Sequence, residues 1–312
     1  MDFEPNEDQA AILSGVEQLI GTLNPEAPRD ASFSAFNTAL DQELAESGFL
    51  QIAREEGFSL LDAALVVDRI ARLPVSAEAA ASALVLPLLE HRDLRPLALA
   101  ESIAAPARFL PHARAMLVAA RDEVLLVQVD AENVEPIDTL FAYPYGRFRR
   151  TDRLEVQSLG AALLAPLRRR WRLALAVEAA GLMQGALDEV LEHVKTRHQF
   201  GRPLGSFQAV QHRLAMAAST TSAARWLALR AAWSDGESDC AMAATYVQDS
   251  IPRVTYDLHQ FYGAMGLTLE CRLHFWTYRL KALLSELGGS SAQARVAANS
   301  TWAFDPQHAK SR

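Results

Sequence analysis

The chain has 312 residues, with 30 Lys and Arg against 38 Asp and Glu and a formal net charge of −8. This length exceeds that of an isolated small module and predicts about two structural units with a sizeable core. The acidic balance gives no basis for nucleic-acid binding. The two cysteines, Cys240 and Cys271, are far apart and form no CxxC, so thiols provide neither a disulfide framework nor a structural zinc site.

The N-terminal sequence and the hydropathy favour a cytoplasmic protein. The chain begins with MDFEPNEDQ, which is acidic where a signal peptide is basic. No run reaches the roughly 18 uncharged apolar residues of a membrane span. We therefore expect no membrane contact and a reducing compartment.

Apolar residues recur every three or four positions in the first hundred residues, a spacing typical of amphipathic helices. The pattern predicts helices over 7–23, 33–44, 60–73 and 77–89. We expect residues 1–105 to form an N-terminal helical domain.

Valine-rich runs after Pro106 favour strands. Residues 116–120 and 124–129 are joined by Arg121-Asp122-Glu123 and predict a hairpin, and 153–156 is a third candidate strand. Residues 106–160 are therefore expected to form a truncated β domain, too short for a large barrel.

The chain becomes helical again after Pro166. Apolar stripes predict helices over 167–197, 206–235, 238–265, 272–287 and 290–303, an arrangement typical of an antiparallel bundle. We expect this C-terminal bundle to span 161–304, followed by a polar tail over 305–312. The fold class predicted is mainly α with a small β insert.

Common catalytic signatures are absent from the sequence: it has no GxGxxG after a strand, no Walker loop, no HExxH and no GxSxG. His259 and His274 have no partner at metal-ligand spacing, so we interpret both as structural and expect no metal site.

The segment 197–212 reads RHQFGRPLGSFQAVQH and predicts an elbow between two long helices. Gly201 ends the first helix and Ser206 can cap the second. Arg197 offers a forked donor beside a helix N-terminus, and Phe200 offers an apolar face, a set that suits a pyrophosphate joined to an aromatic ring. Alternatively, Arg197 caps the preceding helix, and Phe200 and Phe207 are core anchors.

This elbow, extended to RHQFGRPLGSFQAVQHRLA, resembles the R-x-x-F-G-x-x-I/L-x-x-F-Q-x-x-Q-x-x-L-A motif of the acyl-CoA dehydrogenase family. Residues 260–270, QFYGAMGLTLE, resemble the family's Q-x-x-G-G-x-G-F-T-x-E block, with Ala264 where a glycine is usual. The three-part architecture is also similar, so the resemblance covers the whole chain and is strongest over 167–287.

In that family these two blocks come from a neighbouring subunit and hold the adenosine diphosphate end of FAD. The resemblance implies FAD-binding roles for Arg197, Gln199, Phe200, Gln208, Gln260, Gly263 and Gly266. Arg197 would neutralise the pyrophosphate, and the two glycines would allow the backbone to approach it. If both glycines lie inside a helix, a helix–helix contact explains them equally well.

The catalytic base of the family has no counterpart here. Family members remove the substrate's α proton with a glutamate at one of two positions. The commoner position corresponds to Leu287 or Gly288, and the alternative position corresponds to Trp171. Glu286 is one residue away, and such a slip turns a side chain from its proton.

The family's flavin cradle, a T-E-P-x-A-G-S-D type loop with a tryptophan-bearing strand, is also missing. The chain therefore resembles the non-catalytic subunit of heteromeric bacterial acyl-CoA dehydrogenases of steroid and bulky-acyl degradation. This implies an α2β2 assembly with a catalytic chain, a shared FAD, an acyl-CoA substrate and a flavin electron acceptor. Two alternatives remain: a structural subunit that binds no cofactor, and a homomeric enzyme that uses Glu286.

Two arginine clusters stand out in an acidic chain. They could contact phosphates or an acidic partner, or they could simply be solvated. The second cluster is the better candidate for a functional role, because it lies at the start of the helix that leads to Arg197. The clusters consist of Arg147, Arg149, Arg150 and Arg153, and of Arg168, Arg169, Arg170 and Arg172.

Overall fold

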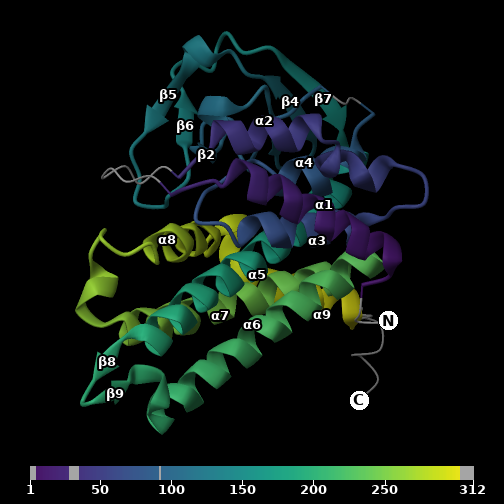
Figure 1. Cartoon of the computed structure of the whole chain (residues 1–312). Helices are drawn as coiled ribbons and strands as arrows, with labels where there is room; N and C mark the ends of the chain where they lie inside the picture. Colours follow the sequence, from purple (N-terminus) through teal and green to yellow (C-terminus); the bar gives the residue numbers. More distant parts are fainter. Residues whose placement is uncertain (1–4, 28–34, 91–92, 303–312) are drawn as a thin grey trace, which may run out of the picture.

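The structure, a computed structural model, describes residues 5–27, 35–90 and 93–302. The predicted tail over 305–312 and the first residues of the helix predicted at 33–44 lie outside these ranges. Figure 1 shows a β layer at the top, a group of N-terminal helices below it, and a bundle of long helices at the bottom. The predicted fold class, mainly α with a small β unit, is confirmed.

The N-terminal helices follow the predicted order. They are α1 (Glu7–Leu23), α2 (Thr38–Glu46), α3 (Leu60–Ala71) and α4 (Ala80–Leu84). Capping boxes at Asn6 and Ser59 start α1 and α3, because each side chain satisfies a free amide of the first turn. The helix predicted over 77–89 is shorter than expected: α4 ends at Leu84, and Pro87 lies in the 3-10 turn that follows.

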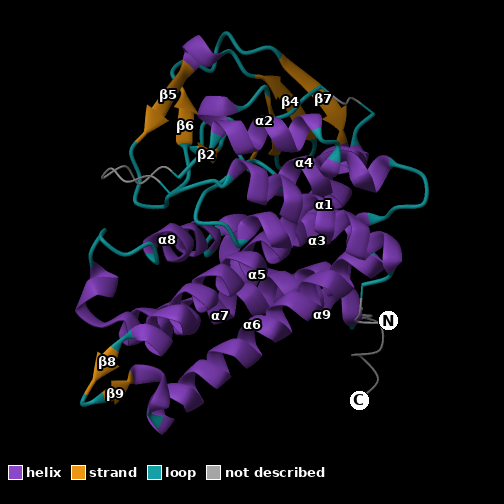
Figure 2. Cartoon of the chain, viewed as in Figure 1, coloured by secondary structure: helices purple, strands orange, loops and turns teal. Residues whose placement is uncertain are grey.

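The β layer contains two small sheets, drawn as orange arrows at the top of Figure 2. One has the order β1-β3-β4-β7, from β1 (Leu97–Ala100), β3 (Ala115–Ala119), β4 (Val124–Gln128) and β7 (Val156–Gly160). The other has the order β2-β6-β5, from β2 (Ala107–Arg108), β6 (Tyr145–Phe148) and β5 (Val134–Ile137). The predicted hairpin is confirmed, since β3 and β4 pair antiparallel and Ala119 lies opposite Val124.

One strand prediction and one domain prediction need correction. The third strand, predicted at 153–156, is β7 and begins only at Val156, opposite Val127. A turn precedes it, in which the Arg150 side chain pairs with Asp152 at 2.8 Å. Strand β1 lies inside the range 1–105 that was expected to be helical. Its short apolar sequence, LALA, pairs parallel with β3 and is mostly buried.

The bundle contains the five predicted helices: α5 (Leu164–Thr196), α6 (Gln208–Ser234), α7 (Glu237–Tyr262), α8 (His274–Leu283) and α9 (Gly289–Thr301). Helix α8 ends before the expected residue 287, because Leu287 adopts a left-handed backbone with φ of 53°. Helix α5 packs directly on α3: a Cβ on Gly181 would lie 2.5 Å from the carbonyl oxygen of Asp68. In the described ranges, no helix combines the length and apolarity that crossing a membrane requires.

Candidate functional site

The elbow around Arg197 is a short hairpin between α5 and α6. Strands β8 (His198–Gln199) and β9 (Arg202–Pro203) form it, at the lower left of Figure 2. The Arg197 amide donates to the carbonyl of His193 at 2.9 Å, and its own carbonyl accepts from the Leu204 amide at 2.8 Å. The backbone is thus satisfied locally. The guanidinium is exposed and makes no hydrogen bond or ion pair to the described residues.

The aromatic residues of the elbow do not both anchor the core. Phe200 is 87% exposed, with φ of 54°, so its interpretation as a core anchor is wrong. Phe207 is half-buried, and the guanidinium of Arg202 lies 3.9 Å from its ring centroid. Ser206 does not cap α6 either. It lies in the 3-10 turn before Phe207, and its hydroxyl donates to the carbonyl of Pro203 at 2.7 Å.

The second block follows the end of α7 as a 3-10 turn, Gly263–Leu267. Gly263 has φ of 68°, and a Cβ there would meet nothing within 4 Å, so its surroundings are open. Gly266 is buried, and a Cβ would lie 2.7 Å from the Cβ of Tyr262. The turn itself therefore requires Gly266, whereas Gly263 presents an accessible backbone. Neither glycine lies inside one of the long helices.

The two blocks lie on neighbouring helix ends, at the left of Figure 1. His193 of α5 stacks on Tyr262 of α7 at 4.0 Å, and the Tyr262 hydroxyl donates to Glu189 at 2.9 Å. Burial, and then the charge of Arg197, lower the pKa of His193, so this imidazole is neutral near pH 7. The fold thus brings the predicted cofactor-binding residues to one end of the bundle, with the side chains of Gln199, Gln208 and Gln260 exposed.

The residues expected to correspond to the family's two base positions lie elsewhere, at a cavity of about 370 Å³ between the β layer and the bundle. Trp171 and Leu287 both line it. The Trp171 indole nitrogen donates to Oε2 of Glu286 at 2.9 Å, and Nε of Arg108 donates to Oε1 at 2.7 Å. Both carboxylate oxygens of Glu286 therefore already accept hydrogen bonds from the protein.

Arg108 links this cavity to a second buried carboxylate. Its Nη1 donates to Glu178 at 3.0 Å, and the Tyr143 hydroxyl donates to the other Glu178 oxygen at 2.7 Å. Burial alone would lower the pKa of Arg108, but Glu178 and Glu286 outweigh it and raise that pKa well above its ordinary value. Burial and the charge of Glu178 raise the pKa of Tyr143 well above its ordinary value, so the phenol stays a donor.

Sequence reasoning missed Arg108, Glu178 and Tyr143. They come from β2, α5 and the loop before β6, so only the folded chain brings them together. No motif or spacing marks them.

Most arginines of the second cluster are engaged inside the protein. Arg169 and Arg170 both bind the Asp235 carboxylate, at 3.1 and 2.8 Å, and Arg172 binds Glu237 at 2.7 Å. These contacts join α5 to Asp235 at the end of α6 and to Glu237 at the start of α7. In the first cluster, two arginines pair with neighbouring surface carboxylates. The second cluster therefore has no better claim to phosphates than the first.

The two histidines interpreted as structural make internal contacts. Nδ1 of His259 lies 2.8 Å from the Gly266 carbonyl oxygen, and Nδ1 of His274 lies 2.7 Å from that of Cys271. Both hold the connection between α7 and α8. Over the described ranges, no group of three His, Cys, Asp or Glu side chains is placed to hold a metal ion.

Comparison with known families identifies the bundle. Residues 169–299 match the acyl-CoA dehydrogenase C-terminal domain. The bundle is an acyl-CoA dehydrogenase domain. The resemblance predicted from the two sequence blocks is therefore confirmed.

One curated relative is a 3-sulfinopropanoyl-CoA desulfinase from Variovorax paradoxus. It is 39% identical to this chain over 104 residues, which are 32% of this chain and 26% of the relative. The chain matches only 18% to 56% of the length of the first four curated relatives.

Two solved structures extend the likeness to the whole acyl-CoA dehydrogenase fold. A variant of the Tcur3481–Tcur3483 steroid ACAD has a TM-score of 0.78 at 22% identity, covering 95% of this chain and 98% of that chain. The ChsE4–ChsE5 complex from Mycobacterium tuberculosis has a TM-score of 0.72 at 19% identity, covering 95% and 97%. At these identities the likeness establishes the fold.

Proposed function

We propose that this chain is a subunit of an FAD-dependent acyl-CoA dehydrogenase and completes the FAD site of a catalytic partner chain. The observation that carries the proposal is the Arg197 guanidinium, which is exposed, makes no hydrogen bond or ion pair to the described residues, and lies at the same end of the bundle as the open backbone of Gly263. A subunit that serves only as a scaffold has no need of a free arginine at this point.

The residues at this end of the bundle fit the adenosine diphosphate part of FAD. Arg197 can donate two hydrogen bonds to a pyrophosphate, which is the strongest pairing available to a guanidinium. The exposed ring of Phe200 offers a face for an aromatic group, and Gly263 has no side chain to block approach. When bound, FAD supplies the acceptor for the hydride that leaves the substrate's β carbon.

We infer that this chain does not supply the base. A general base needs a carboxylate oxygen directed at the proton that it removes. Both oxygens of Glu286 accept from Arg108 and Trp171, and the next residue is the apolar Leu287. The carboxylate that removes the α proton then belongs to the partner chain.

The names of the two structural relatives support a heteromeric assembly, because each pairs two different chains. By analogy we propose an α2β2 assembly acting on an acyl-CoA, with a bulky or steroid-derived acyl group as the favoured substrate class. A flavin electron acceptor would reoxidise the cofactor.

The proposal is tested by purifying the chain alone and together with an acyl-CoA dehydrogenase chain from the same organism as candidate partner. We expect the lone chain to be colourless or weakly flavinylated and to oxidise no acyl-CoA. The copurified complex should be yellow and active with an artificial electron acceptor. Stoichiometric FAD on the lone chain would contradict the proposal.

A further inference from the structure

A second cavity lies between the N-terminal helices and the β layer. Its volume is about 500 Å³, within the usual range of sites for small molecules. Helix α2, the 3-10 turn Phe49–Arg54, residues 93–96 and the residues before β3 line it. None of the residues assigned above to FAD or to the base positions takes part, so its role is separate from the proposed function.

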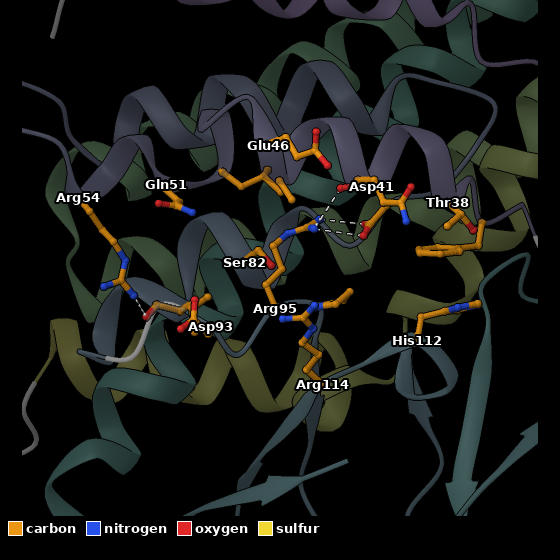
Figure 3. Close-up of a pocket in the computed structure, with 16 residues that line it drawn as sticks. Thr38, Asp41, Glu46, Gln51, Arg54, Ser82, Asp93, Arg95, His112 and Arg114 are labelled. Carbon is orange, nitrogen blue, oxygen red and sulfur yellow. Dashed lines mark hydrogen bonds and ion pairs between the residues drawn. The ribbon is translucent and has the colours of Figure 1, made fainter. Parts of the chain in front are cut away.

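Two arginines from different elements meet in this cavity. Arg95 is fixed, because its Nη2 donates to Asp41 at 2.9 Å and to the Glu78 carbonyl at 2.9 Å. Arg114 is exposed, and its guanidinium makes no hydrogen bond or ion pair within the described part of the chain. Figure 3 shows the Arg114 guanidinium directly below that of Arg95, in the centre of the cavity.

An aromatic wall stands beside the two arginines. The rings of Phe36 and His112 stack at 4.1 Å with an interplanar angle of 16°. Burial lowers the pKa of His112, although Asp41 opposes the shift, so the imidazole is neutral at pH 7 and can donate or accept one hydrogen bond. Thr38 and Gln51 add a hydroxyl and an amide to the lining.

None of the three carboxylates that line the cavity pairs with the Arg114 guanidinium. Asp41 is bound to Arg95. In Figure 3 the Glu46 carboxylate points away from Arg114, and Asp93 lies on the side of Arg54. An anion at Arg114 therefore meets one uncommitted cation and the fixed Arg95–Asp41 pair.

We propose that this cavity binds a phosphorylated small molecule. Its phosphate group contacts Arg114 beside Arg95, and its organic part lies against Phe36 and His112. A tetrahedral phosphate accepts hydrogen bonds from several directions, as converging arginines require, and guanidinium groups are well suited to phosphate. The phosphate alone would fill only a small part of the cavity, so the remaining space requires an organic part.

Titration calorimetry on the full-length chain tests the site, with ribose 5-phosphate and phenyl phosphate as probes in phosphate-free buffer. We expect saturable binding of at least one probe, and a loss of about tenfold or more in affinity for Arg114→Gln, because a charge-assisted contact is removed. The matched control is Arg149→Gln, an exposed arginine of the same layer outside the cavity, which should bind normally.

Probes without adenine or a pyrophosphate separate this site from the FAD blocks, because those blocks are proposed to hold the adenosine diphosphate part of FAD. The proposal is overturned if neither probe binds or if Arg114→Gln binds like the wild type. Arg114 is exposed, so its variant should fold, and circular dichroism would verify this.

Discussion

The indole nitrogen of Trp171 lies 2.9 Å from Oε2 of Glu286 and donates to it. These two residues are 115 positions apart. By the resemblance to acyl-CoA dehydrogenases, we propose that Trp171 corresponds to one of their two base positions and that Glu286 lies next to the other. Arg108 binds the second oxygen of Glu286 at 2.7 Å. Glu286 thus takes part in an internal contact between the β layer and the bundle.

Replacing Glu286 with Gln should leave turnover of the assembled enzyme within a few-fold of wild type. The reason is that both carboxylate oxygens of Glu286, which lines the cavity, already accept hydrogen bonds from Arg108 and Trp171. Turnover is measured with a saturated acyl-CoA and an artificial acceptor, at verified flavin occupancy. If Glu286 were the base, activity would fall by about 10²–10⁴, and such a fall would favour the homomeric alternative.

Replacing Arg108 with Met should destabilise the chain strongly. The change removes the guanidinium that pairs with the largely buried carboxylates of Glu178 and Glu286. Breaking one partner of a buried pair costs about 3–5 kcal/mol in free energy of unfolding. Urea unfolding measures it, with the exposed Arg149→Met as control. A loss similar to that of the control would mean that the network does not stabilise the fold.

Local patterns predicted most of the helices, because an apolar stripe is a property of neighbouring residues. They also predicted the β3–β4 hairpin and the two motif blocks. Strand β1 was missed because four apolar residues do not reveal their parallel partner. The prediction that Ser206 caps α6 was wrong, because its hydroxyl donates to the carbonyl of Pro203 instead. The Arg108 network depends on residues up to 178 positions apart, which no local pattern encodes.

Acidification should destabilise the chain through its buried histidines. Burial lowers the pKa of His274 below its ordinary 6.5, although its contact with Cys271 opposes the shift. The unfolded chain therefore binds more protons than the folded chain just below pH 6.5, and stability falls as the pH drops from 6.5 through the folded pKa.

We test this with His274→Gln, which keeps a donor for the Cys271 carbonyl but does not titrate in this range. The free energy of unfolding of the variant should drop less between pH 7.5 and 5.5 than that of the wild type. Identical pH dependence in the two proteins would show that His274 makes no contribution.

The central claim, that this chain contacts FAD in trans, is tested most directly by the FAD affinity of the assembled complex with Arg197→Ala. Removing a charge-assisted contact of about 1.5–3 kcal/mol should weaken FAD binding roughly ten- to a hundredfold while folding is retained. The control is Lys195→Ala, a neighbouring exposed cation that pairs with Glu192, and its FAD affinity should stay close to wild type. Unchanged FAD affinity in the Arg197→Ala complex would contradict the account and favour a structural subunit.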